Sequence, residues 1–295
     1  MRTIPAHVTA IDTHVHPQTP EFLAAMGGRR TQMGAHFGRE RQPVSFAELA
    51  GRYRDLGMMA VLVNSDDETR SGVPGAPNAL LGDAVTAHPD VFLAMCGIDP
   101  WKGRAALEEV RRCHGEYGVL GVGELNPARQ AFFPNDRRFY PLWQLCADLG
   151  LVVMFHCGFP GAGAGTPGGM GYQLDYARPV PYLDAVAADF PELRIIAAHP
   201  GWPWHLENLA ACWHKSNYYI DLSGWAPRYL PPEVVRYADS LISDRVLFGS
   251  DWPVLEPERW LHEFGELPVK PASRDKILLG NALKLFGLER AELAR

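Results

Sequence analysis

The feature that most constrains the fold of this chain is a series of short apolar runs, each ending in polar or glycine residues. Eight such runs recur along the 295 residues, at 8–16, 58–65, 91–100, 119–126, 151–158, 193–201, 218–224 and 245–251. They are apolar at nearly every position rather than at alternate positions, which is typical of strands buried on both faces of a parallel sheet. The runs therefore predict eight parallel strands.

Helical patterns separate these runs. Ser45, followed three residues later by Glu48, has the capping-box spacing that begins a helix, here over 45–57. Further helices are expected at 78–89, 102–118, 135–150, 179–191, 204–215, 231–242 and 256–267, with a last one at 272–287. Strands that alternate with helices in this way predict an α/β fold, a (β/α)₈ TIM barrel that forms a single domain over residues 1–295. A doubly wound open sheet is the alternative, but no G-x-G-x-x-G signature follows the first strand.

Two connections are long, residues 17–44 after the first strand and the glycine-rich residues 157–180 after the fifth. Both follow strands, on the side of a barrel where active sites are built. Long loops in compact domains are usually functional or mobile, so we expect both to shape a site, although 157–180 could also be a surface excursion. The glycine-rich loop lacks the lysine of a phosphate-binding loop.

Side chains that bind metals end five of the eight predicted strands. They are His14 and His16, Glu124, His156, His199 and Asp251. Because His14 and His16 are two residues apart on a strand, they should share the interior face, with Ile11, Thr13 and Val15 facing the helices. Taken singly, each of these residues could have a purely structural role. The histidine pair could serve packing alone, His156 could be a core histidine, and Asp251 could cap a helix. Together in barrel order they predict a metal site.

Imidazole nitrogens combined with a carboxylate oxygen suit a divalent cation. Zinc is the first expectation, and manganese, iron or cobalt would also fit. The positions predict one metal, with a second left open.

Composition limits the other partners. The formal net charge is −6 and the pI about 6.0, which argues against nucleic acid as a partner. Arg29, Arg30, Arg39 and Arg41 form the densest basic cluster, interpreted as a solvated surface. No apolar stretch reaches the about 18 residues of a membrane span, and no signal peptide is expected. The five cysteines contain no CxxC pair, which favours reduced thiols and a cytoplasmic location.

The whole pattern resembles the amidohydrolase superfamily. The likeness is closest to its family 2 branch, which includes enzymes similar to aminocarboxymuconate-semialdehyde decarboxylase and to resorcylate decarboxylase. The segments that carry it are IDTHVHP, NDRRFYPLWQLCADLGLVVMFHCG, LRIIAAHPGWPW, RVLFGSDWP and KILLGNALKLFGL, spread over nearly the whole chain.

This resemblance implies roles for particular residues. His14, His16, His156 and Asp251 would hold one divalent metal, His199 would orient or protonate the reacting group, and Asp251 would also shuttle a proton. Glu124, in GVGELNP, departs from this pattern and resembles the TatD-type nuclease branch. It could bridge a second metal, contact the substrate or orient a histidine.

Hydrolysis of a small cyclic, amide or lactone-like substrate is the first expectation. A metal lowers the pKa of bound water to about 7, Asp251 would take the proton, and His199 would stabilise the oxyanion. The alternative is non-oxidative decarboxylation of an aromatic or muconate-type acid. A TatD-like nuclease and a non-catalytic barrel are less favoured.

Several residues are candidates for substrate contacts. Trp202, Trp204, Trp225 and Trp252 follow strands and could stack a planar substrate or serve as core or interface packing. Arg178 and Arg228 are candidate carboxylate clamps or surface ion pairs. The expected partner is a small molecule, and the aromatic surface would permit a homodimer.

Overall fold

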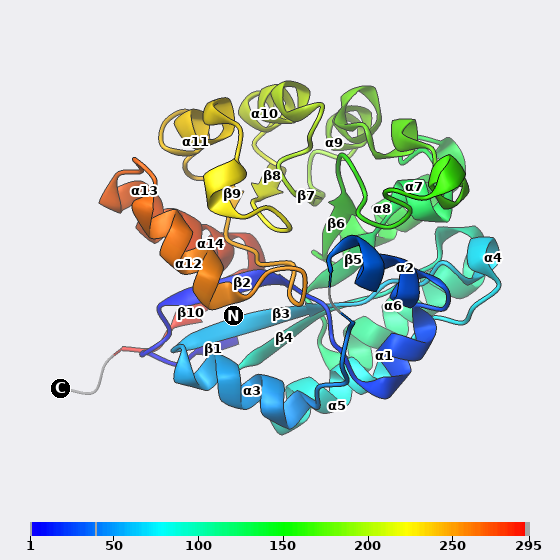
Figure 1. The fold of residues 1–295 in the computed structure, drawn as a ribbon, viewed down its shortest axis with the longest axis horizontal. Helices are drawn as coiled ribbons and strands as arrows, with labels where there is room; N and C mark the ends of the chain where they lie inside the picture. The colour runs from blue at the N-terminus through cyan, green and yellow to red at the C-terminus, as the bar shows by residue number, and fades with distance from the viewer. Residues whose placement is uncertain (1, 39, 293–295) are drawn as a thin grey trace.

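The eight predicted strands form one parallel barrel in the computed structural model, which describes residues 2–38 and 40–292 (Figure 1). The strands are β2 Ala10–Val15, β3 Met58–Val63, β4 Phe92–Cys96, β5 Gly121–Leu125, β6 Val152–His156, β7 Arg194–Ala198, β8 Tyr218–Asp221 and β9 Val246–Leu247. Each pairs with the next in chain order. The TIM barrel expected from the apolar runs is confirmed.

The barrel closes through the segment that follows β9. Thr13 N donates to Phe248 O at 3.0 Å, Asp251 N to His14 O at 2.9 Å and His16 N to Trp252 O at 2.9 Å. These bonds join the first strand to the chain just beyond the last. The C-terminal end of β2 and residue Asp251 are therefore held against each other at the mouth of the barrel.

Each strand is buried on both faces, which explains its continuous apolar sequence. One apolar cluster fills the interior and contains Met59, Val61, Leu93, Met154 and Ile196. The residues between them on the strands pack in a second cluster against the surrounding helices. Substituting a polar residue on either face would therefore bury an unpaired group.

The helices lie outside the barrel, as predicted. They are α1 Pro20–Ala25, α2 Arg29–His36, α3 Phe46–Asp55, α4 Glu68–Ser71, α5 Ala79–Ala87, α6 Arg104–Tyr117, α7 Pro127–Gln130, α8 Tyr140–Asp148, α9 Asp184–Asp189, α10 His205–His214, α11 Pro232–Ala238, α12 Pro257–Glu266, α13 Pro271–Asp275 and α14 Asn281–Phe286. The capping box expected at Ser45 is present: Ser45 Oγ accepts from Glu48 N at 3.2 Å, and Glu48 Oε2 accepts from Ser45 N at 2.8 Å. Among the described residues, no helix is long and apolar enough to cross a membrane.

The short helices α1, α2, α4 and α7 were not predicted, and neither was a small second sheet. β1 (Arg2–Ile4) pairs in parallel with β10 (Leu288–Arg290) in a small separate sheet beside the barrel. Ile4 and Leu288 are buried there and extend the interior cluster at the N-terminal end of the barrel. Three-residue strands are too short to show a period, so the sequence pattern could not reveal them.

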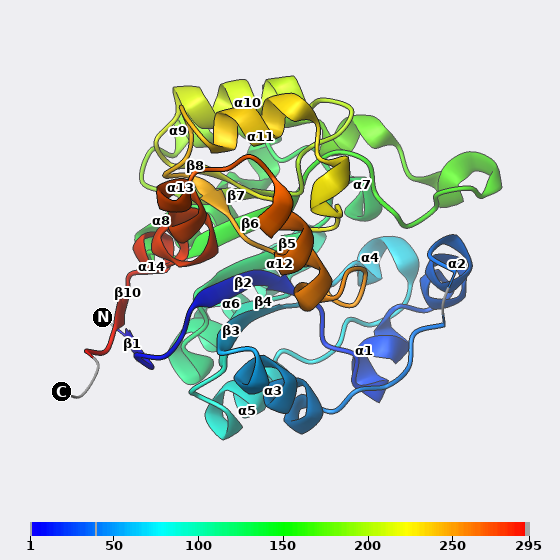
Figure 2. The ribbon, with the colours of Figure 1, turned by 60° about the vertical axis from the view of Figure 1, so that its left-hand side comes forward.

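The two long connections meet over the mouth of the barrel. The first contains α1 and α2, and Figure 2 shows α2 and the loop after β6 projecting on the same side of the molecule. Gln32 of α2 joins them, because its Nε2 donates to Ala164 O at 3.0 Å and its Oε1 accepts from Gly163 N at 2.9 Å. The connections expected to shape a site are thus linked to each other above it.

Candidate metal centre and its cleft

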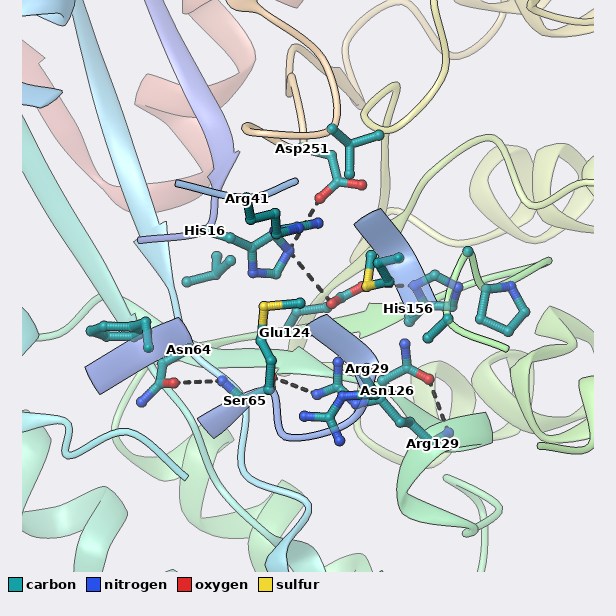
Figure 3. A pocket seen from close by; sticks show the side chains of 18 of the residues that line it. His16, Arg29, Arg41, Asn64, Ser65, Glu124, Asn126, Arg129, His156 and Asp251 are labelled. Carbon is teal, nitrogen blue, oxygen red and sulfur yellow. Dashed lines mark hydrogen bonds and ion pairs between the residues drawn. The ribbon is translucent and has the colours of Figure 1, made fainter. Parts of the chain in front are cut away.

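The residues predicted at the strand ends converge at the C-terminal mouth of the barrel. Figure 3 shows four of them, His16, Glu124, His156 and Asp251. His14 and Glu124 lie within β2 and β5, and His156 ends β6. His199 directly follows β7, and His16 directly follows β2. Asp251 comes from the segment after β9, close to His16 in space although 235 residues distant in sequence.

Irregular strand pairing directs the side chains of His14 and Glu124 into the barrel. The register between β2 and β3 shifts between Asp12 and Val15, and that between β5 and β6 shifts between Val122 and Leu125. A bulge reverses the alternation of faces along a strand. Ile11 therefore packs in the interior cluster together with Met59, not toward the helices, and the alternation predicted for it is wrong.

Two site residues have a backbone conformation that side chains seldom adopt. The φ angle is 71° at His199 and 59° at Asp251, both in the left-handed region. Such a conformation costs about 1–3 kcal/mol and is concentrated at functional sites. Gly224 approaches both residues, since a Cβ there would lie 2.9 Å from His199 Nδ1 and 3.1 Å from Asp251 Oδ2.

Three of the four predicted ligands form a compact group. His14 Nε2 lies 3.1 Å from His16 Nε2, His16 Nε2 lies 3.1 Å from Asp251 Oδ1, and His14 Nε2 lies 3.8 Å from that same oxygen. Two ligands of a tetrahedral zinc, each about 2.1 Å from the metal, would be about 3.4 Å apart. The three atoms are thus spaced as the ligands of one divalent cation are.

His156, the fourth predicted ligand, belongs to a neighbouring group with Glu124 and His199. His156 Nδ1 lies 2.7 Å from Glu124 Oε1 and 3.0 Å from His199 Nε2. Burial lowers the pKa of His156 and favours a neutral ring that donates to Glu124 through Nδ1. His156 Nε2 is buried and has no hydrogen-bond partner among the described residues. A buried lone pair without a donor is what a metal would satisfy, so the residues present fit a divalent cation.

Glu124 lies between the two groups. Besides its bond to His156, its Oε1 is 3.5 Å from His199 Nε2 and its Oε2 is 3.8 Å from His16 Nε2. Burial alone would raise the pKa of Glu124, but the contact with His156 and the hydrogen bond to His199 hold it well below the usual range. Glu124 is therefore an ionised carboxylate that orients His156 and also lies within reach of a metal.

Sequence reasoning missed Asp221, at the end of β8. Its Oδ2 lies 3.1 Å from His14 Nδ1, and its Oδ1 accepts from His199 N at 3.0 Å and from Ser223 N at 2.9 Å. Burial acts to lower the pKa of His14, but the charge and hydrogen bond of Asp221 raise it to about 10. Asp221 ends a predicted strand, as the other site residues do, so the same positional signal could have found it.

Ser223 and Asp12 complete the support of the site. Ser223 Oγ lies 3.1 Å from His14 Nδ1 and 2.9 Å from His199 Nδ1. Asp12 accepts from the backbone nitrogens of His14 and Ser250 and from the hydroxyls of Ser250 and Tyr53. Burial raises the pKa of Asp12 to about 6. These bonds fix the first strand to the segment that carries Asp251.

A cleft with two arms opens above this cluster, and the arms share His156, His199 and Asp251. The arm that carries the arginines, here called the polar arm, is lined by Arg29, Arg41, Asn64, Ser65, Asn126 and Arg129, together with apolar side chains such as Phe22, Met26 and Met33; its space, part of it open to solvent, is about 850 Å³. The aromatic arm is lined by Phe37, Phe159, Trp202, Trp225 and Tyr229 together with Gly224. A cleft that joins polar and apolar walls at a group of titratable residues is typical of a binding site.

The predicted tryptophans divide into two sets. Trp202 and Trp225 line the aromatic arm, with ring centroids 6.1 Å apart. Trp252 is 4% exposed and packs in the core, because its backbone closes the barrel against His16. Trp204 immediately precedes α10 and is not among the described residues that line either arm.

The predicted clamps Arg178 and Arg228 lie elsewhere. Neither is among the described residues lining the cleft. Arg178 forms two bonds with Glu207, at 2.9 and 2.6 Å, while Arg228 lies 3.8 Å from Glu263 and is more than half exposed. These acidic partners explain why the two arginines stay at the surface.

Part of the basic cluster instead reaches the site. Arg29 is 7% exposed and lines the polar arm, as does Arg41, so the interpretation of this cluster as a solvated surface is wrong for both. Arg39 lies outside the described residues. Arg129, which sequence reasoning did not single out, lines the same arm from α7.

Comparisons with known proteins agree with this geometry. A sequence profile of the amidohydrolase family matches residues 11–288. The gamma-resorcylate decarboxylase of Polaromonas sp. is 23% identical over 272 residues, which cover 80% of this chain and 82% of that protein.

Two solved structures share the fold. An uncharacterised TIM-barrel protein from Bordetella bronchiseptica superposes with a TM-score of 0.76 at 26% identity, covering 94% of this chain and 98% of that one. A dihydroxybenzoic acid decarboxylase from Polaromonas, solved with manganese and 2-nitroresorcinol, gives 0.66 at 20% identity and covers 95% and 97%. Since the family profile spans nearly the whole barrel and every strand that carries the cluster, the chain belongs to the amidohydrolase family.

Proposed function

We propose that this enzyme is a divalent-metal-dependent decarboxylase that removes CO₂ from a small aromatic or otherwise unsaturated carboxylic acid. The observation that carries the proposal is the position of the histidine–carboxylate cluster where the polar and aromatic arms of the cleft meet. A planar acid can lie in the aromatic arm with its carboxylate at the cluster. The similarity to a gamma-resorcylate decarboxylase supports this chemistry over the hydrolysis expected first.

His14, His16, His156 and Asp251 are the residues that would hold the metal. Zinc and manganese both suit nitrogen and carboxylate ligands, and the Polaromonas dihydroxybenzoic acid decarboxylase contains manganese. A divalent cation bound there would neutralise negative charge that builds up on the oxygens of the substrate. Asp221 and Glu124 would set the tautomers of His14 and His156 by accepting from their Nδ1 atoms.

The reaction needs one proton. The bond between the carbon and its carboxylate breaks, CO₂ leaves, and the electron pair left on carbon takes a proton, so that RCOO⁻ and H⁺ become RH and CO₂. We assign the delivery of this proton to His199, which lines both arms of the cleft; its Nδ1 lies 3.0 Å from Ser223 O and its Nε2 is turned toward Glu124 and His156. Burial acts to lower the pKa of His199, but the hydrogen bond to Glu124 and the charge of Asp251 leave it raised, which favours a proton donor.

The aromatic arm would hold the ring. Phe159 and Trp202 are 5.9 Å apart in an edge-to-face contact, and Trp202 is 44% exposed although it is large and apolar. An exposed aromatic side chain in a cleft wall gives a planar ligand a surface to stack on. Trp225 continues this wall toward Gly224 and the cluster.

The test is a panel of acids and lactones incubated with metal-loaded enzyme. Carboxyl-¹³C ortho-hydroxybenzoates should release ¹³CO₂, and in D₂O the product should carry one deuterium at the carbon that lost the carboxylate. Turnover of lactones without CO₂ would establish hydrolysis instead. No CO₂ from any acid of the panel, with metal bound, would contradict the proposal.

A further inference from the structure

We propose that Arg29 and Arg129 form a buried anion subsite in the polar arm, which selects substrates that carry a second carboxylate remote from the one at the histidine cluster. The proposal deepens the function proposed above and relies on it for the placement of the reacting carboxylate. Figure 3 shows the two guanidinium groups side by side, next to Ser65 and Asn126.

The two arginines are buried and share one acid. Their side chains are 9% and 11% exposed, and Asp67, at 4%, lies between them. Asp67 Oδ2 is 2.5 Å from Arg29 Nη1 and 3.5 Å from Arg129 Nε. Among the described residues, no other carboxylate lies within ion-pair distance of either guanidinium. Two cations therefore face one anion, and a buried excess charge of this kind needs a counterion.

Most of the N–H donors of the Arg129 side chain form no hydrogen bond within the described part of the chain. A guanidinium carries five N–H donors in a planar fork. Within the described part of the chain, Arg129 uses its side chain in one hydrogen bond, from Nη2 to Ser65 Oγ at 2.5 Å, and its buried Nε has no hydrogen-bond partner. Buried donors are almost always paired in folded proteins. Nε is directed at Asp67, 3.5 Å away, so a carboxylate in the polar arm would bind the Nη donors and supply the missing charge.

Hydrogen bonds to neighbouring residues fix the position of Arg129. Asn126 Oδ1 accepts from Arg129 N at 3.0 Å and caps the short helix α7, and Ser65, two residues after β3, accepts from Nη2. Burial and the nearby charge of Arg129 lower the pKa of Arg29, as expected for two cations held close together. A rigid fork with open donors suits bidentate recognition of a carboxylate.

The first experiment compares ligands that do not turn over. Calorimetry on the metal-loaded enzyme measures the binding of benzoate and of the three benzenedicarboxylates, which place the second carboxylate at three different separations. At least one dicarboxylate should bind about tenfold or more tightly than benzoate. If none does, the subsite is refuted.

The second experiment uses variants. Arg129→Met should weaken the preferred dicarboxylate by about 10- to 100-fold and leave benzoate within about twofold. Arg129→Lys, which keeps the charge and loses the fork, should fall between, and Ser65→Ala should weaken the same ligand without removing the cation. Arg54→Met is the matched control, because Arg54 is paired with Asp90 outside the cleft and its loss should change neither affinity.

The outcomes separate the two proposals. Equal weakening of benzoate and dicarboxylate by Arg129→Met would mean that Arg129 only supports the fold, and would overturn the subsite. A preference for the dicarboxylate that disappears in Arg129→Met would confirm the subsite even if no acid released CO₂, in which case only the decarboxylase proposal would fail.

Discussion

Replacing Asp221 by asparagine should weaken metal binding without unfolding the barrel. Asp221 and His14 are both fully buried, so their contact is not screened by solvent. Asp221 Oδ2 accepts from His14 Nδ1–H, so Nε2, which faces His16 and Asp251, is the nitrogen that would lose its proton and bind the metal when the site is loaded. In the variant, the amide oxygen can still accept from the backbone nitrogens of His199 and Ser223. The amide NH₂ then faces His14 Nδ1 and favours the tautomer whose Nε2 carries a proton.

Losing such a partner typically costs about 10- to 100-fold in metal affinity, or about 1.4–2.7 kcal/mol. The assay is competition for zinc or manganese against a chelator of known affinity, with circular dichroism to check the fold. Asp90→Asn is the control, since Asp90 pairs with Arg54 on the surface. If Asp221→Asn binds metal as tightly as the wild type, then Asp221 does not position His14 for a metal and the assignment of His14 as a ligand is undermined.

Four further predictions follow from the same geometry. His156→Ala should lose most activity because it removes a ligand without a substitute; wild-type turnover with metal still bound would disprove the assignment. Glu124→Gln should keep one equivalent of metal, since an amide oxygen can still accept from His156 Nδ1; loss of half the bound metal would reveal a bridged pair. In metal-free protein, His14 has its pKa raised to about 10 and is therefore protonated at pH 8. Metal binding should release this proton, and the affinity for the metal should rise with pH up to about 10. A metal affinity that is independent of pH between 7 and 9 would contradict this. Gln32→Ala should raise KM by about 3- to 10-fold with little change in melting temperature, because it cuts the two bonds that join the loops over the cleft. Gln144→Ala, at an exposed position of α8, should leave KM unchanged; an unchanged KM in Gln32→Ala would show that the joined loops do not hold substrate.

The proton carried by His14 also gives the metal-free fold a pH dependence. Its pKa is about 10 in the folded chain and about 6.5 in an unfolded one, so the folded state holds the proton more tightly. This contribution to stability is complete below pH 6.5 and is lost as the pH rises toward 10. Asp221 has the opposite sign: its pKa is lowered to about 2, so its contribution is present above pH 4 and is lost as the pH falls toward 2.

The barrel could be predicted because its signal is repeated. Each strand is apolar on both faces, and eight copies of this pattern in alternation with helices leave few other folds. The polar residues at the strand ends were found for a related reason, since parallel strands bring their C-terminal ends to one side. Asp221 obeys the same rule, since it ends β8, although the sequence analysis did not single it out.

Other features depend on geometry that no period shows. The bulges in β2 and β5 change which side chains face inward, and they decide that Ile11 joins the interior cluster. The burial and pairing of the arginines were still harder to predict from the sequence. Arg178 looked like a clamp but is paired with Glu207, while Arg29 looked like surface charge but is buried beside Asp67. Burial and pairing arise from contacts between segments far apart in sequence, and composition does not record them.

The most direct test of the central claim is the metal content per chain after reconstitution with zinc or manganese and removal of unbound ions. The cluster of His14, His16, His156 and Asp251 predicts about one equivalent in the wild type and a large loss in His16→Ala. A wild-type chain that retains no divalent ion under any of these conditions would contradict the account, because the converging histidines and carboxylates would then have no metal to bind.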